Sequence, residues 1–231
     1  MHNLYINKPN AKATEPDESY TQLHQAIVRG DLSPNQRLVE MELAQKLGVG
    51  RAAVREALTR LEHDGLVARE PNRGAHVRAI SEAEAIEMLE VRAVLEGLAA
   101  RHAARHITAQ ALATLQAIHA EMQVCLDQGD LVGVSALNAQ WHDQILAIAN
   151  HQTVEGLIQR LRAQHVLFRY RTLLVPGRAH HSLQDHQTIL AALAAHDEAA
   201  AENAMRQHLT NVVDALRQGK ASRKASAPSW L

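Results

Sequence analysis

The amino-acid sequence predicts a mainly α-helical protein: an N-terminal helix-turn-helix with a β-hairpin, followed by an antiparallel bundle of six to seven helices. Two observations support this prediction. Apolar residues make up 46% of the 231 residues but aromatic residues only 3%, and sheets depend on aromatic and β-branched side chains. In addition, apolar residues recur at helical spacing along most of the chain.

The N-terminal elements are expected between residues 19 and 80. Apolar side chains recur at helical spacing from Tyr20 to Ile27, and a Gly-Asp pair ends this first helix. Two short helices, about 40–47 and 51–64, then meet across a turn that contains two glycines. This arrangement predicts a helix-turn-helix.

Two short extended segments, residues 65–69 and 75–78, follow the third helix. The sequence between them contains proline, asparagine and glycine, which is typical of a turn. The segments are therefore expected to form a hairpin. A hairpin directly after a helix-turn-helix predicts a winged helix-turn-helix domain over residues 19–80.

Longer amphipathic helices are expected from residue 81 to residue 218. Their connections are short, which favours antiparallel neighbours. The helices are placed near 82–106, 108–128, 131–149, 152–173, 179–195 and 198–217. The terminal segments 1–18 and 219–231 are polar and show no apolar period, so we expect both to be disordered.

Composition restricts the compartment and the way in which the chain can bind nucleic acid. The single cysteine, Cys125, cannot form a disulfide within the chain, and the N-terminal segment lacks the pattern of a secretory signal. No apolar run reaches the roughly 20 residues that span a bilayer. We therefore expect a cytoplasmic protein with no membrane partner. The formal net charge is −1, so DNA binding requires a local basic surface.

The helix expected at residues 51–64 has one apolar face and one face that carries arginines. On a helical wheel, Arg51, Ala52, Arg55 and Thr59 share the outward face. Two arginines near the N-terminus of a short helix suit the DNA major groove, because a guanidinium group can donate to both acceptors of guanine. An ordinary amphipathic surface helix with two charged residues is the alternative.

The hairpin supplies a second basic element. Arg73 and Gly74 lie at its expected tip, where a glycine lets the backbone approach a phosphate or a minor groove closely. Arg69 and Arg78 place further positive charge on both sides of this tip. The hairpin therefore favours the DNA-binding interpretation.

Histidine is unusually frequent, with 15 residues. Asn138 and His142 are spaced i, i+4 and share one helix face, whereas His186 and His208 lie on two other expected helices. If all four side chains face inward, they could bind a divalent cation such as Zn²⁺, Ni²⁺ or Mn²⁺. The alternative is a set of surface or core histidines without a ligand, because such pairs also arise by chance in a histidine-rich chain.

The N-terminal part contains motifs of a known family. They are Ile27-x-x-Gly30-x-Leu32-x-Pro34, Leu43-Ala44-x-x-Leu47-Gly48-Val49-x-Arg51-x-x-Val54-Arg55-Glu56-Ala57-Leu58 and Gly65-Leu66-Val67. With these motifs, residues 20–80 resemble the winged helix of GntR-family transcription regulators. The resemblance implies that Arg51 and Arg55 contact bases or phosphates of operator DNA and that Arg73 and Gly74 form the wing tip.

Two positions depart from the family pattern. Asn35 stands where the family usually has glycine, and Gly50 stands where a serine caps the recognition helix. Glycine is still a tolerable cap, so the loss of the serine side chain costs only about 0.5 kcal/mol.

The C-terminal part resembles the FCD-type ligand domain of the FadR subfamily. The motifs are Glu90-Val91-Arg92-x-x-Leu95-Glu96, Asn138-x-x-x-His142, Asp185-His186-x-x-Ile189-Leu190 and Met205-x-x-His208-Leu209. The resemblance implies a metal ion held by Asn138, His142, His186 and His208, which in turn binds a small carboxylate. Asn138 replaces the commoner aspartate, which removes a negative charge and weakens metal binding. Six bundle helices rather than seven indicate the VanR-like branch.

Arg92 is the candidate for a direct contact to the effector. It lies on the first bundle helix and could bind a carboxylate with two parallel hydrogen bonds. The alternative is an exposed arginine, or one that pairs with Glu96 one helical turn further along.

The expected function is that of a homodimeric, ligand-responsive repressor whose two recognition helices read a palindromic operator. Effector binding would shift the equilibrium between DNA-competent and incompetent placements of the winged helices. We expect no catalysis. The first alternative is a metal-dependent enzyme that uses the histidine cluster and a bound water, but no general base is evident. The second, an architectural DNA binder without a ligand, leaves the histidine cluster unexplained.

Overall fold

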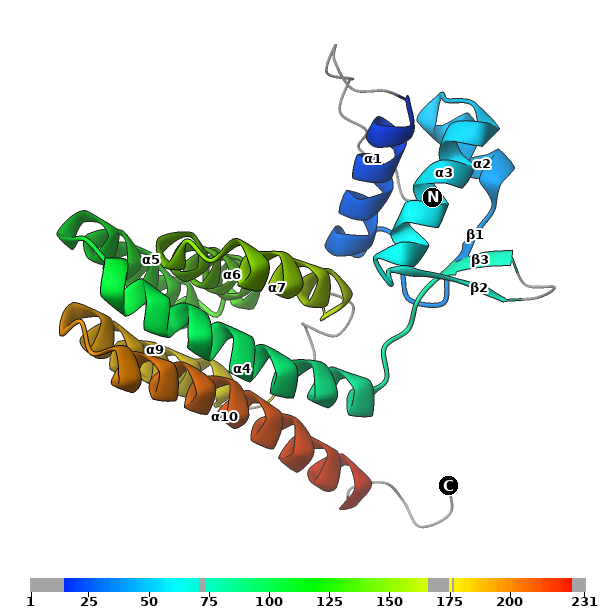
Figure 1. Ribbon diagram of the computed structural model, residues 1–231. Helices are drawn as coiled ribbons and strands as arrows, with labels where there is room; N and C mark the ends of the chain where they lie inside the picture. Colours follow the sequence, from blue (N-terminus) through cyan, green and yellow to red (C-terminus); the bar gives the residue numbers. More distant parts are fainter. Residues whose placement is uncertain (1–14, 71–73, 166–174, 176, 226–231) are drawn as a thin grey trace. The chain divides into compact units, whose positions relative to one another are not determined.

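The computed structural model describes residues 15–70, 74–165, 175 and 177–225 (Figure 1). Its contacts divide the chain into two compact units, the first built on residues up to Ser81 and the second on the helices from Glu82 onward. The described part of the chain is mostly helical, with one small sheet. This confirms the predicted mainly α-helical fold. None of the described helices has the length and apolar character needed to cross a membrane.

The first unit has the element order of a winged helix-turn-helix. Its elements are α1 (Glu15–Arg29), β1 (Arg37–Leu38), α2 (Glu40–Leu47), α3 (Arg51–His63), β2 (Val67–Glu70) and β3 (Gly74–Val77). Strand β3 lies between the other two strands, and both pairings are antiparallel. The sequence analysis did not predict β1, because two residues are too short to show an alternating pattern.

The apolar face of α3 forms the centre of this unit. Val54, Leu58 and Leu61 are completely buried and pack in one cluster with Leu23 and Ile27 of α1. Burying a side chain of this size contributes about 1.5–3 kcal/mol. These contacts hold α3 so that its opposite face remains exposed.

Backbone geometry explains the departure from the family pattern at Asn35. This residue has φ of 66°, in the left-handed region that glycine adopts without strain. Asparagine tolerates this region better than other residues with a side chain. Asn35 can therefore replace the usual glycine without altering the turn that precedes β1.

The second unit is a helical bundle. Its described helices are α4 (Glu82–His106), α5 (Ala109–Asp127), α6 (Leu131–Ala149), α7 (Gln152–His165), α9 (Arg178–Ala194) and α10 (Glu198–Ala225). Each begins within one residue of its predicted start, and α10 extends beyond its predicted end. Thr108 and Asp130 cap α5 and α6, since each side chain accepts a hydrogen bond from a backbone N–H of the first turn. The helix expected at 152–173 can be compared only as far as His165, and its last part lies outside the described residues.

Helix α4 is the central element of the bundle. It runs beside α10 (Figure 1) and also contacts α6 and α9. Gly97 allows this close approach, because a Cβ at this position would lie 2.7 Å from the Arg206 side chain of α10. Because α4 packs against these helices, its polar side chains in the interior of the bundle lie close to residues of the neighbouring helices.

The ends of two helices correct the expectation of disorder for residues 15–18 and 219–225, and the rest of both terminal segments lies outside the described residues. The sequence analysis expected disorder up to residue 18 and from residue 219, whereas α1 begins at Glu15 and α10 continues to Ala225. At the N-terminus, Asp17 pairs with Arg60 of α3 across 2.6 Å, and this tertiary contact has no local sequence signal. At the C-terminus, the alanine, lysine and arginine residues favour a helix although they show no apolar period.

Candidate functional site

The outward face of α3 presents the predicted arginines. The side chains of Arg51 and Arg55 are 64% and 59% exposed, and Ala52 between them is exposed as well. The buried residues of α3 lie on the other side of the helix. The helix therefore has the two faces that the sequence predicts, and DNA contact by Arg51, Ala52 and Arg55 stays a prediction.

An acidic residue that the sequence analysis did not consider holds both arginines. The Glu40 carboxylate, on α2, accepts hydrogen bonds from Nε and Nη2 of Arg55 at 3.0 to 3.3 Å. It also lies 3.9 Å from Nη2 of Arg51. The hydrogen bond from Arg55 lowers the pKa of Glu40. Glu40 thus fixes the direction in which the Arg55 guanidinium group points.

Thr59 has partners within the protein. Its hydroxyl donates a hydrogen bond to the backbone oxygen of Arg55 at 2.9 Å and accepts one from Nη2 of Arg69 at 3.0 Å. Arg69 belongs to β2, so Thr59 connects the hairpin to α3. A DNA contact by Thr59 stays a prediction.

Of the two predicted wing-tip residues, the structure describes Gly74. It begins β3 with φ of 71°, and a Cβ at this position would meet no atom within 4 Å. The positive φ explains the need for glycine, and the open space permits close approach of another molecule. Arg73 lies outside the described residues.

We expect the substitution Glu40→Gln to weaken specific operator binding about 1.4- to 5-fold, because Arg55 loses the ion pair that orients it. An exposed ion pair contributes about 0.2–1 kcal/mol, which corresponds to this range. Glu42→Gln is the matched control, since it removes the same charge from an exposed position of α2. Fluorescence anisotropy with operator and random duplexes would measure both variants. Tighter operator binding by Glu40→Gln than by Glu42→Gln would show that Glu40 competes with DNA for Arg55.

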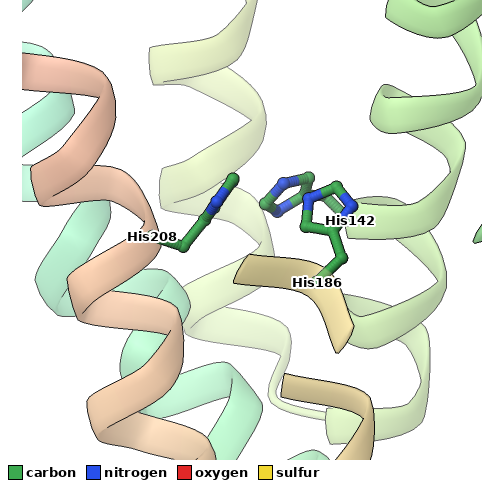
Figure 2. Close-up of side chains that lie close together, drawn as sticks. All are labelled: His142, His186 and His208. Carbon is green, nitrogen blue, oxygen red and sulfur yellow. The ribbon is translucent and has the colours of Figure 1, made fainter. Parts of the chain in front are cut away.

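Three of the four predicted metal ligands converge inside the helical bundle. His142 of α6, His186 of α9 and His208 of α10 point toward one another (Figure 2), and each offers a nitrogen within 4.8 Å of the other two. The three residues are only 3%, 0% and 2% exposed. They are not surface histidines, whereas the alternative of core histidines without a ligand stays open.

Two carboxylates, one buried and one partly buried, orient two of the imidazole rings. Nδ1 of His142 lies 2.6 Å from Oε2 of Glu96, and Nδ1 of His208 lies 3.1 Å from Oδ2 of Asp185. Because an ionised carboxylate only accepts hydrogen bonds, both Nδ1 atoms carry the proton. The lone pair is then on Nε2, the nitrogen that can coordinate a metal ion. Such carboxylate–histidine pairs are the usual support of metal-binding imidazoles.

His186 differs from the other two histidines in its contacts. Its ring stacks on Trp141 with centroids 4.1 Å apart and an angle of 15° between the planes. Neither of its ring nitrogens has a hydrogen-bond partner among the described residues, although both are buried. A buried imidazole without partners is costly, and coordination of a metal ion would satisfy one nitrogen. The residues present therefore fit a divalent metal ion.

Burial also sets the charge state of the cluster. It lowers the pKa of His208 to about 4, although the hydrogen bond with Asp185 acts in the opposite direction. Burial lowers the pKa of His186 well below 6.5, and the neighbouring histidines add to this effect. Both imidazoles are therefore neutral at pH 7, which is the form that binds metals.

The structure also shows the positions of the fourth predicted ligand, Asn138, and of the predicted effector contact, Arg92. Asn138 is half-buried on α6, one turn before His142, and its role as a ligand stays a prediction. Arg92 is 9% exposed, and its Nε and Nη2 atoms lie 2.9 and 2.8 Å from Oε1 of Glu96. The structure thus agrees with the pairing alternative and not with an exposed arginine. A contact between Arg92 and an effector stays a prediction.

Sequence reasoning assigned no role at the site to Glu96, Asp185 or Trp141. Glu96 and Asp185 belong to the motifs that carry the family resemblance, and Asp185 directly precedes His186. The sequence signal that could have identified the two carboxylates was an acidic residue within an otherwise apolar helix face. It did not reveal which histidine each carboxylate contacts, because the partners lie 46 and 23 residues away along the chain.

Comparison with protein families gives two matches. Residues 17–77 match the family described as bacterial regulatory proteins of the gntR family, and residues 87–211 match the FCD domain. The chain belongs to the GntR family. Because this is a family of regulatory proteins, the chain is a transcription regulator, and the alternative of a metal-dependent enzyme is discarded.

Individual relatives of this GntR-family protein agree with the assignment. The transcriptional repressor RspR of Escherichia coli K12 is 30% identical over 207 residues, which cover 89% of this chain and 91% of RspR. The repressor GlaR of the same organism is 27% identical, with 88% and 96% of the two chains covered. The relatives match both parts of the chain.

Solved structures show the same fold. Escherichia coli McbR/YncC aligns with a TM-score of 0.74 at 23% identity and covers 90% of this chain and 99% of its own. A GntR regulator from Rhodococcus sp. RHA1 aligns with a TM-score of 0.67 at 24% identity, with 94% and 100% covered. The winged helix-turn-helix followed by a helical FCD domain is therefore an architecture that solved regulators share.

Proposed function

We propose that this GntR-family regulator is a repressor that binds a palindromic operator as a homodimer and responds to a small carboxylate. Residues 19–80 bind the DNA, and residues 81–218 bind the ligand and form the dimer. A divalent metal ion, Zn²⁺, Ni²⁺ or Mn²⁺, is bound by Asn138, His142, His186 and His208. The protein acts in the cytoplasm, where the operator lies.

The DNA-binding half of this proposal rests on α3. Its exposed arginines, Arg51 and Arg55, suit the major groove, and a dimer presents two such helices to a two-fold symmetric operator. The names of RspR and GlaR describe those relatives as repressors, which favours repression here.

The ligand-binding half rests on one observation: three buried histidines with converging nitrogens, two of them oriented by carboxylates. Three imidazoles and one amide oxygen leave coordination positions open. A metal ion bound here would offer these positions to a carboxylate oxygen. FCD domains are ligand-binding domains, and the buried cluster lies within the FCD match.

The chain itself provides a connection between ligand and DNA. Helix α4 carries Glu96, the partner of His142, and only residues 78–81 separate α4 from strand β3 of the wing. A ligand that shifts α4 can change the positions of the winged helices. It does so if it binds the protein more tightly in one of these conformations than in the other. Arg92 of α4 is a second group through which such a ligand could act.

Elemental analysis of the purified full chain beside His142→Ala tests this proposal, with His106→Ala as the control because His106 is exposed. We expect metal in the wild type and in His106→Ala, and none in His142→Ala. Thermal melts against a panel of small carboxylates follow, because a ligand at 100 times its Kd stabilises the folded state by about 2.7 kcal/mol. The active acid should then release the protein from operator DNA.

Absence of metal from all three proteins, with no acid raising Tm, would refute the metal site and leave only the DNA-binding half. Metal in the wild type together with operator binding that no acid changes would refute the sensor role instead.

A further inference from the structure

Two buried arginines support the histidine cluster in similar ways. On one side, Arg92 contacts Glu96, and Glu96 contacts His142. On the other side, Arg178 contacts Asp185, and Asp185 contacts His208. Each of these two series of contacts thus leads from a guanidinium group through a carboxylate to the imidazole of a proposed metal ligand.

The two arginines differ in how well their donors are satisfied. Both Nε and NH2 of Arg92 lie within 2.9 Å of one oxygen of Glu96. Among the described residues, the contacts of Arg178 are long: 3.5 Å from Nη1 to Asp185 and 3.4 Å from Nη2 to the backbone oxygen of His208. Its buried Nε has no hydrogen-bond partner among the described residues.

Arg178 is nevertheless deeply buried, with 5% exposure. A buried guanidinium group with an unused donor and weak partners is unfavourable by itself. A bound anion would provide the missing acceptor and neutralise the charge.

The position of Arg178 places this unused donor beside the cluster. It is the first residue of α9, two turns before Asp185 and His186 on the same helix. Its Nη2 contacts the backbone oxygen of His208 at 3.4 Å, and its Nη1 contacts the same Asp185 oxygen that lies beside the His208 ring. The donor therefore belongs to the same interior region as the converging histidine nitrogens.

We infer that Arg178 is the anion-binding arginine of this site: its Nε and its other N–H groups hold the carboxylate of the effector next to the metal ion. This inference rests on the proposed function and names the residue that recognises the carboxylate. It differs from the expectation for Arg92, because a ligand could recruit Arg92 only by competing with the short contacts to Glu96. A planar carboxylate matches the guanidinium fork of Arg178 without breaking such a pair.

The test compares Arg178→Lys with Arg92→Lys in the full, zinc-loaded chain. Both variants keep the positive charge and its carboxylate partner, but lysine lacks Nε and the planar fork. Acetate is the probe, and acetamide at the same ionic strength is the neutral control. Trp141 stacks on His186, and in a Trp230→Phe background it is the single tryptophan, so its fluorescence follows binding in the cluster.

We expect Arg178→Lys to bind acetate about 10-fold more weakly than the parent chain, because one charge-assisted hydrogen bond is lost. Arg92→Lys should bind acetate within about 3-fold of the parent. The zinc content of both variants, measured by elemental analysis, should equal that of the parent, and acetamide should bind to none of the proteins. A second variant, Arg178→Gln, should weaken acetate binding further, by about 10- to 100-fold.

Two outcomes would overturn the inference. If Arg178→Lys and Arg178→Gln bind acetate as the parent does, Arg178 is a structural arginine. If Arg92→Lys is the variant that loses acetate, Arg92 is the anion contact. Both outcomes leave the proposed function intact, whereas a parent chain that binds neither zinc nor acetate would refute the proposed function itself.

Discussion

Replacing Glu96 by glutamine should lower the free energy of unfolding by about 3–5 kcal/mol, because breaking a buried ion pair leaves an uncompensated charge. Glu96 is 2% exposed and Arg92 is 9% exposed. Without the carboxylate, the guanidinium group stays in the interior of the bundle, and its two short contacts lose their charged partner. Nδ1 of His142 loses its charged acceptor at the same time. Urea unfolding at pH 7 in the presence of a chelator would measure the change.

Glu90→Gln is the matched control for this prediction. Glu90 lies on the same helix and pairs with Arg217 of α10 at 2.9 Å, but both side chains are more than half exposed, at 55% and 53%. Exposed pairs of this kind contribute about 0–1 kcal/mol, so this variant should remain close to the wild type. Equal effects of the two substitutions would contradict a stabilising role of the buried pair.

The same Glu96→Gln protein should also bind metal more weakly. Loss of a carboxylate behind a coordinating imidazole typically costs about 10- to 100-fold in metal affinity. Competition with a chromogenic chelator would separate this effect from stability, provided that it is measured below the temperature at which the variant unfolds.

In metal-free protein, lowering the pH from about 6.5 to about 4 should destabilise the fold steadily. The pKa of His208 is about 4 in the folded protein, below its ordinary value of about 6.5 in an unfolded chain. In this pH window the unfolded chain binds a proton that the folded protein excludes, so stability decreases as the pH falls. The loss amounts to roughly 3 kcal/mol from His208. The lowered pKa of His186 acts in the same direction.

Urea unfolding between pH 7.5 and 4 would measure this dependence, beside His208→Gln and His106→Gln. The variant without His208 should show a shallower slope by about 1.4 kcal/mol per pH unit, whereas His106→Gln, which changes an exposed residue, should follow the wild type. A wild-type profile that is flat between pH 6.5 and 4, or that matches His208→Gln, would contradict the buried neutral state of this histidine.

Local patterns in the sequence were sufficient for the helices and for the choice of candidate residues. The apolar residues of α3 repeat with the period of a helix, so their burial and the exposure of Arg51 and Arg55 follow from the sequence alone. His142, His186 and His208 were selected because they lie on separate helices of one bundle and match the motifs of a family. Periodicity and spacing are properties of neighbouring residues, which is why they can be read without a structure.

Contacts between distant segments could not be predicted in this way. Strand β1 exists because β3 provides its hydrogen-bond partner, and the ion pair between Glu40 and Arg55 joins two helices. No short-range pattern records such pairs. The same is true of the helical start at Glu15, which the sequence analysis placed too late.

The sequence by itself determined the winged helix-turn-helix, the helical bundle, the family resemblance and the four candidate metal ligands, because helical periodicity and motif spacing are local. Only the tertiary structure decided that Glu96 and Asp185 orient two of these histidines. It also decided that, among the described residues, the His186 ring and the Arg178 Nε have no hydrogen-bond partner, whereas Arg92 is paired. These features depend on distances of a few ångströms between side chains from different helices. Such distances are set by how α4, α6, α9 and α10 pack, and packing involves the whole bundle at once.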